Sequence, residues 1–208
     1  MSDAEKNFEA FSRIVDDLHA TWTMWQELFG EEARSETHNV LVSASPDVFK
    51  YVRWHWLVSV TLELAKLDDR DQMYGRDNLT IQRIFNETDY ANDEQRHVAQ
   101  TVMDFALAKI QRDEFKKFRN RIIAHNDLLA VTGIENPMGD MSIEPLYATV
   151  YAVRSFRDRI AAIRKGEPIN IATGENYYPS PEDDKRWHND VRRLVSLLSA
   201  GLDAEQNG

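Results

Sequence analysis

The sequence predicts an all-α protein, an antiparallel helical bundle of about five long helices and one or two short ones. Apolar residues recur at spacings of three and four through most of the chain, the spacing of one buried helical stripe. Glycine and proline are sparse, at 8 and 6 in 208 residues, and they fall between the periodic segments. A chain of this length is expected to form one domain, residues 1–202, followed by a frayed tail at residues 203–208.

Seven segments have helical spacing, and recognisable start and stop signals lie between them. The long segments span residues 3–29, 46–67, 93–125, 142–165 and 181–201. The third of these is either one helix or two helices joined by a kink near residues 111–114. The short helices are expected within residues 31–44 and from Leu79 to about Asn86, the latter capped by Asn78.

Individual residues mark where these helices begin and end. Ser45 and Pro46 combine a capping hydroxyl with a proline in the first helical position. Gly30 is expected to close the first helix in the left-handed conformation, and Gly201 to stop the last one. The helix 46–67 is apolar on most faces, which is typical of the middle of a bundle or of a subunit interface.

Histidine and tryptophan side chains within these helices are expected to be structural. Trp22 and Trp25 share the apolar side of the first helix, so we expect them in the core. His55 lies inside the apolar run of the helix 46–67 and is expected to be a hydrogen-bonded core histidine.

Composition limits the possible functions. The chain has no cysteine, which excludes disulfides, thiolate metal sites and cysteine nucleophiles, and a reducing cytoplasm is the expected location. No run of about 18 apolar residues is present, so no membrane span is expected. The N-terminus lacks a basic region followed by an apolar one, so no signal peptide is expected. The net charge of −10 opposes binding to nucleic acid unless a local basic patch offsets it.

Residues 115–127 contain the densest polar cluster, built on a helix whose apolar stripe is Phe115, Phe118 and Ile122. The other positions include Arg119, Asn120, Arg121, His125, Asn126 and Asp127. Between residues 109 and 121, six basic residues stand against two acidic ones, a local charge of +4. The alternative is a solvated helix face whose last-turn histidine interacts favourably with the helix dipole.

This cluster resembles the motif of the HEPN superfamily, in which an arginine, usually followed by a polar residue, precedes a histidine by a short interval. Here Arg119 and Asn120 are followed by His125, with five residues between the arginine and the histidine. Residues 121–127 are similar to the abortive-infection (AbiU-type) branch of that superfamily, and the blocks at residues 25–30 and 67–80 agree with it. The resemblance runs from about residue 15 to the last helix, and only the Arg/His motif is specific.

The resemblance implies a metal-independent endoribonuclease without a cofactor, acting as a toxin or an abortive-infection effector in phage defence. Its histidine would move protons to and from the RNA, and its guanidinium groups would stabilise the phosphate charge of the transition state. The implied catalytic residues are Arg119, His125 and Asn120. The local basic patch adds Arg121, Lys116, Lys117 and Arg112 as expected phosphate contacts.

The resemblance also implies a homodimer, an RNA substrate and an antitoxin partner, whereas neither DNA nor a membrane is an expected partner. Some members of the superfamily keep the fold and bind ligands or RNA without cutting RNA. A non-catalytic dimeric interaction module is therefore the second hypothesis.

Helical geometry leaves two arrangements of the site open. Arg121 and His125 are four residues apart and share a helix face. Arg119 and His125 are separated by about 120° around the axis and about 9 Å along it. Arg119 can serve the same phosphate as His125 if the helix frays before His125, or if a second subunit brings its own copy of the motif.

Overall fold

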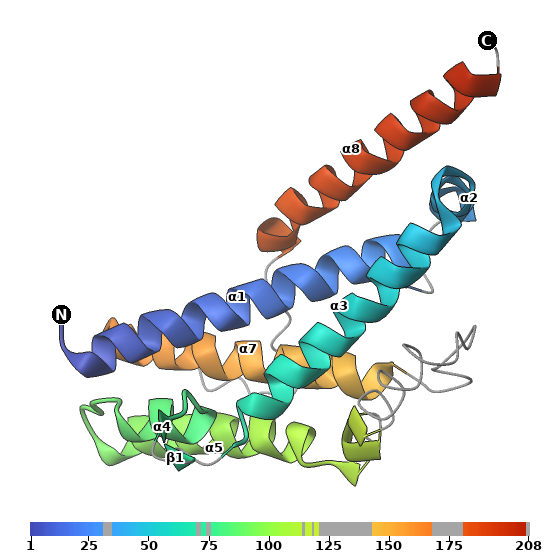
Figure 1. The fold of residues 1–208 in the computed structure, drawn as a ribbon. Coiled ribbons are helices and arrows are strands. Elements are labelled where there is room, and N and C mark those ends of the chain that lie inside the picture. The colour runs from blue at the N-terminus through green and yellow to red at the C-terminus, as the bar shows by residue number, and fades with distance from the viewer. Residues whose placement is uncertain are drawn as a thin grey trace. The chain divides into compact units, whose positions relative to one another are not determined.

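The computed structural model describes residues 1–30, 35–69, 72–73, 76–113, 115–117, 119–120, 143–167 and 181–206, and the prediction of an all-α bundle is confirmed. Its helices are α1 (Asp3–Phe29), α2 (Ser35–Ala44), α3 (Pro46–Lys66), α4 (Ile81–Asn86), α5 (Asp93–Ile110), α7 (Glu144–Arg164) and α8 (Pro181–Gln206) (Figure 1). Two short strands, β1 (Gln72–Met73) and β2 (Arg76–Asp77), pair antiparallel. No helix in the described ranges is long and apolar enough to cross a membrane.

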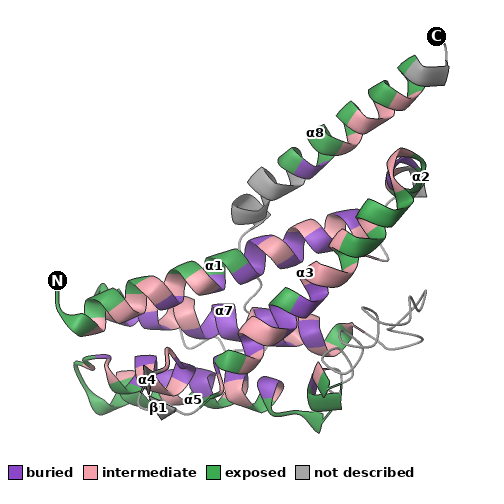
Figure 2. Cartoon of the chain, viewed as in Figure 1, coloured by how far each residue is buried: buried purple, intermediate pink, exposed green. Residues whose placement is uncertain are grey.

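The chain forms two compact units, and α1 and α3 contribute to both. The first unit comprises Met1–His19 and Thr61–Tyr178, and the second comprises Ala20–Val60 and Pro179–Gly208. In the first unit, α7 packs along α5. Phe11 of α1 meets Phe156 of α7 edge to face, with ring centroids 5.9 Å apart. The inward sides of α5 and α7 are the buried stripes visible in Figure 2.

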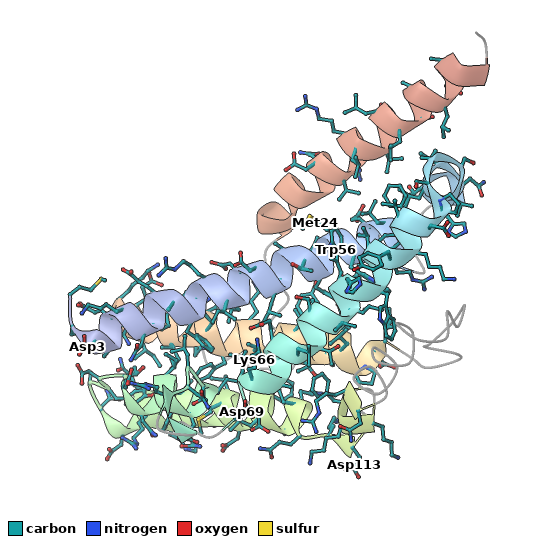
Figure 3. The ribbon with its side chains drawn as sticks, viewed as in Figure 1. Asp3, Met24, Trp56, Lys66, Asp69 and Asp113 are labelled. Carbon is teal, nitrogen blue, oxygen red and sulfur yellow. The ribbon has the colours of Figure 1, made fainter. Side chains whose placement is uncertain are left out.

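The second unit has an aromatic and aliphatic core. The predicted core positions of Trp22 and Trp25 are confirmed: the two side chains are buried and their rings stack 5.3 Å apart. Nε1 of Trp25 donates a hydrogen bond to the carbonyl of Arg53 at 3.1 Å. Met24 and Trp56, labelled in Figure 3, belong to the apolar side chains that pack around three buried residues. Those three residues are Leu28, Leu41 and Val191.

The surface of α3 is not covered all round within the described part of the chain. Val48 and Tyr51 are 55% and 66% exposed, although Leu57, Val60 and Leu64 on the same helix are buried. His55 is half-buried rather than a core residue, and its ring lies beside that of Tyr51. Some of the apolar residues that surround this helix therefore face solvent, and they lie in its N-terminal half.

Two glycines end helices for different physical reasons. Gly30 follows α1 as predicted, but it is not in the left-handed conformation. A Cβ at Gly30 would lie 2.5 Å from the carbonyl oxygen of Gln26, so the close approach of backbone excludes a side chain. Gly166 does adopt the left-handed conformation, with φ 67°. Its N–H and that of Glu167 donate to the last carbonyls of α7, the pattern of a Schellman motif.

Three local expectations are wrong. Thr80, not Asn78, caps α4, because its hydroxyl accepts the backbone N–H of Arg83 at 3.1 Å. Helix α8 continues through Gly201 to Gln206, since a glycine lowers helix stability without preventing helix formation. Leu194, which its spacing from Val191 and Leu198 predicts to face inward with them, is 41% exposed, whereas Val191 is buried and Val195 is half-buried.

Gly201→Ala should raise the free energy of unfolding by about 0.5–1 kcal/mol, because alanine has the higher helix propensity. A Cβ at Gly201 meets no atom within 4 Å, so no steric cost offsets the gain. Urea unfolding followed by circular dichroism measures the change. Gly30→Ala is the matched control and should destabilise the protein. Destabilisation by Gly201→Ala would mean that α8 ends near Gly201 after all.

Candidate functional site

The basic segment, defined here as residues 109–120, begins where α5 ends. The backbone N–H of Gln111 donates to the carbonyl of Leu107 at 2.8 Å and closes the last turn of α5. The chain bends at Arg112, and the described residues from Asp113, labelled in Figure 3, to Asn120 are helical. Of the two predicted possibilities, the kinked one is therefore confirmed up to Asn120.

The start of the basic segment is fixed by the burial of Ile110 and by two contacts, one with α7 and one with Asp68. Ile110 is buried, and the hydroxyl of Thr149 on α7 lies 3.5 Å from the carbonyl of Lys109. The side chain of Gln111 donates to Asp68, just after α3, at 2.9 Å. The helical turn that follows is thus attached to a braced part of the first unit.

Burial of Phe115 sets the direction of the other side chains in the segment. Phe115 is completely buried. On a helix with about 100° per residue, Arg119 lies only about 40° from Phe115, whereas Asn120 lies about 140° away. The observed burial follows this geometry, since Arg119 is half-buried and Asn120 is exposed. Lys116 and Lys117 are also exposed.

Arg119 and Asn120, two of the three predicted catalytic residues, contact one another. Nε and Nη2 of Arg119 donate to Oδ1 of Asn120 at 3.3 and 3.2 Å. Both donors lie on one edge of the planar guanidinium, so the other edge is not used by this contact. Such an edge can accept two oxygens of a phosphate in a bidentate pair.

The predicted phosphate contacts fall into two groups. Arg112, Lys116 and Lys117 are exposed on the basic segment and present positive charge to solvent. Arg121, the fourth predicted phosphate contact, lies outside the described residues, as does His125, the third predicted catalytic residue. The geometry between His125 and either arginine therefore stays a prediction.

A second polar cluster lies between α1 and α7 and was not predicted. Nη1 of Arg154 lies 2.8 Å from Nδ1 and 2.5 Å from Nε2 of His19. Arg157 pairs with Asp16 of α1 at 2.6 Å and with Asp158 at 2.5 Å. The available signal was Arg157 itself, which stands between Val153 and Ile160 at positions of the apolar stripe of α7.

Electrostatics make this second cluster structural. His19 and Arg154 are only 5% and 6% exposed, so neither offers a surface to a substrate. Burial, together with the positive charges of Arg154 and Arg157, lowers the pKa of His19 from 6.5 to about 3. The imidazole is therefore neutral near pH 7 and can accept a hydrogen bond from Arg154.

Within the described ranges, no group of three or more histidine, aspartate or glutamate side chains could hold a metal ion. Comparison of the chain with family models, with curated proteins and with solved structures finds no match. The site is therefore described by its own residues and their chemistry.

The neutral state of buried His19 predicts a loss of stability in acid. Below about pH 6.5 the unfolded chain binds a proton at His19 that the folded chain does not bind until about pH 3. The free energy of unfolding should thus decrease as the pH is lowered from about 6.5 to about 3. This group contributes at most about 1.4 kcal/mol per pH unit to that decrease. His19→Gln should remove that part of the slope. The same slope in His19→Gln and in the exposed-site control His97→Gln would contradict the assignment.

Phe115→Ala should lower the free energy of unfolding by about 3–5 kcal/mol, because it leaves a cavity at a fully buried aromatic position. Lys117→Ala, two residues away and exposed, should change it by less than about 0.5 kcal/mol. Chemical unfolding of the three proteins measures both values. Equal stability of Phe115→Ala and wild type would show that the basic segment is not anchored at this residue.

Proposed function

We propose that the chain is a metal-independent endoribonuclease of the HEPN type, a toxin or abortive-infection effector. Arg119, Asn120 and His125 form its catalytic set. Arg112, Lys116, Lys117 and Arg121 contact phosphates of the RNA. The protein acts as a homodimer and is restrained by an antitoxin partner.

The observation that carries this proposal is the setting of Arg119. Arg119 is half-buried and lies one helical turn after the buried Phe115, and one edge of its guanidinium contacts Asn120. An arginine held in this way loses less side-chain conformational entropy when it binds a phosphate. Exposed basic side chains precede it on the same segment, so a phosphate chain can meet positive charge before it reaches Arg119.

The chemistry needs only protein groups and the RNA. His125 takes the proton of a 2′-hydroxyl, and the 2′-oxygen attacks the adjacent phosphorus. The bond from phosphorus to the 5′-oxygen breaks, and that oxygen receives the proton that His125 took from the 2′-hydroxyl. Arg119 stabilises the charge that builds on the phosphoryl oxygens. The products are an RNA with a 2′,3′-cyclic phosphate and an RNA with a 5′-hydroxyl.

A second function, a non-catalytic dimeric interaction module, is favoured by a different observation. Large apolar side chains are exposed on the second unit, among them Tyr51 at 66% and Leu197 at 63%. An exposed apolar surface is typical of a protein contact. The net charge of −10 also disfavours nucleic acid as a general partner.

Purified protein should cleave total RNA or tRNA in the presence of EDTA, and His125→Ala should lower the rate by at least about 100-fold. The optimum should lie between about pH 6 and 8, because an unperturbed histidine changes charge there. His97→Ala, an exposed histidine on α5, is the matched control and should retain the wild-type rate. Equal cleavage by wild type and His125→Ala would overturn the nuclease and leave the interaction module.

Arg121→Ala and subunit mixing distinguish the two arrangements of the site. A composite site across a homodimer predicts a small effect of Arg121→Ala and a large effect, of several kcal/mol, for Arg119→Ala. Arg119→Lys should rescue poorly, because lysine cannot form a bidentate pair. Mixing Arg119→Ala with His125→Ala subunits should restore activity, since one composite site is then intact. No recovery, with a large effect of Arg121→Ala, would favour the pair within one helix.

A further inference from the structure

We propose that Asn120 belongs to the catalytic set only as a positioning residue: it acts through Arg119 and does not itself contact the RNA, an inference that rests on the proposed function. Its amide oxygen holds one edge of the guanidinium and directs the other edge to the scissile phosphate. The position therefore favours a neutral acceptor, which fixes the arginine without cancelling its charge.

The hydrogen bonds determine which way the amide faces. Nε and Nη2 of Arg119 both approach Oδ1 of Asn120, at 3.3 and 3.2 Å. A guanidinium has only donors, so the amide nitrogen cannot take this place, whereas an amide oxygen has two lone pairs. Each contact is at the long end of the usual range and is weak alone. Together they define the plane of the guanidinium.

Burial restricts the same arginine from the other end. Around the helix axis, Arg119 projects within about 40° of the buried Phe115. This direction toward the protein confines the aliphatic part of the Arg119 side chain. Asn120 points to the exposed side and confines the head group. The remaining edge, formed by Nη1 and the second hydrogen of Nη2, has no recorded contact with the described residues and has the geometry for a bidentate phosphate pair.

The neutral charge of Asn120 has a chemical consequence. An aspartate at this position would accept the same two hydrogen bonds, and more strongly. It would also place a negative charge next to the guanidinium and oppose an anionic substrate. Asn120→Asp should therefore keep the arginine in place but weaken RNA binding, and Asn120→Ala should leave the positive charge intact but release the arginine.

Nuclear magnetic resonance of the arginine side chains tests the positioning without any RNA. The Nε–H signal of Arg119, assigned by its loss in Arg119→Lys, should exchange with water more slowly than that of exposed Arg192. In Asn120→Ala the two exchange rates should become similar, and in Asn120→Asp Arg119 should stay protected. Exchange at Arg119 that is unchanged by Asn120→Ala would overturn the inference, whether or not the protein cuts RNA.

Kinetics on the wild-type activity tests the consequence for catalysis. Asn120→Ala should lower kcat about 10-fold with little change in KM, and Asn120→Asp should mainly raise KM. In an Arg119→Ala background, Asn120→Ala should have no further effect, because a residue that acts through Arg119 has nothing left to position. Asn39→Ala, the same change at an exposed helix position, is the control. Independent, multiplying effects of the two substitutions would overturn the inference, whereas absence of wild-type cleavage would overturn the proposed function and leave the exchange result standing.

Discussion

Burial of Phe115 is the constraint on which the presentation of the basic segment depends. A helix returns to one face every three to four residues, so fixing one fully buried side chain fixes the directions of its neighbours. Arg119 is drawn toward the protein, while Lys116, Lys117 and Asn120 are turned outward. The contact of Gln111 with Asp68 braces the start of the same segment. Burial of one aromatic side chain is thus accompanied by a half-buried arginine one turn later and by lysines that stay exposed at the surface.

The cluster between α1 and α7 shows a different use of charge. Arg154 and Arg157 replace apolar residues on the inward side of α7, and they are matched by His19, Asp16 and Asp158. Removing one member of such a buried network costs more than the network contributes in total, because a charge is left unpaired. These pairings fix how α7 lies against residues 12–19 of α1, and of their members the Asp16 side chain stays 63% exposed.

Much of the fold could be predicted from spacing alone, because amphipathic helices of 18 residues or more repeat their apolar positions many times. The bounds of α1 and the burial of Trp22 and Trp25 follow from that pattern. The same pattern does not decide which of two nearby residues takes a given structural role. Thr80 rather than Asn78 caps α4 because of the backbone conformation there, which the sequence does not state.

The candidate site, too, could be predicted only in part from the spacing of its residues. The helix that carries Phe115, and the half-buried position of Arg119 four residues later, follow from periodicity. The hydrogen bonds between Arg119 and Asn120 do not, since adjacent residues on a helix point in different directions and only a long side chain can bridge them. The pairing of Arg154 with His19 joins residues far apart in the chain, and local spacing contains no information about it.

We propose that RNA is cut by attack of its own 2′-hydroxyl and that Arg119 stabilises the charge that builds on the phosphate. The most direct measurement is mass spectrometry of the products from an oligoribonucleotide and from its copy with 2′-hydrogen in place of every 2′-hydroxyl, both incubated with wild-type protein in EDTA. The account predicts 2′,3′-cyclic phosphate and 5′-hydroxyl ends from the first oligonucleotide and an intact second one. Cleavage of the 2′-deoxy copy, or products ending in 5′-phosphate, would contradict it.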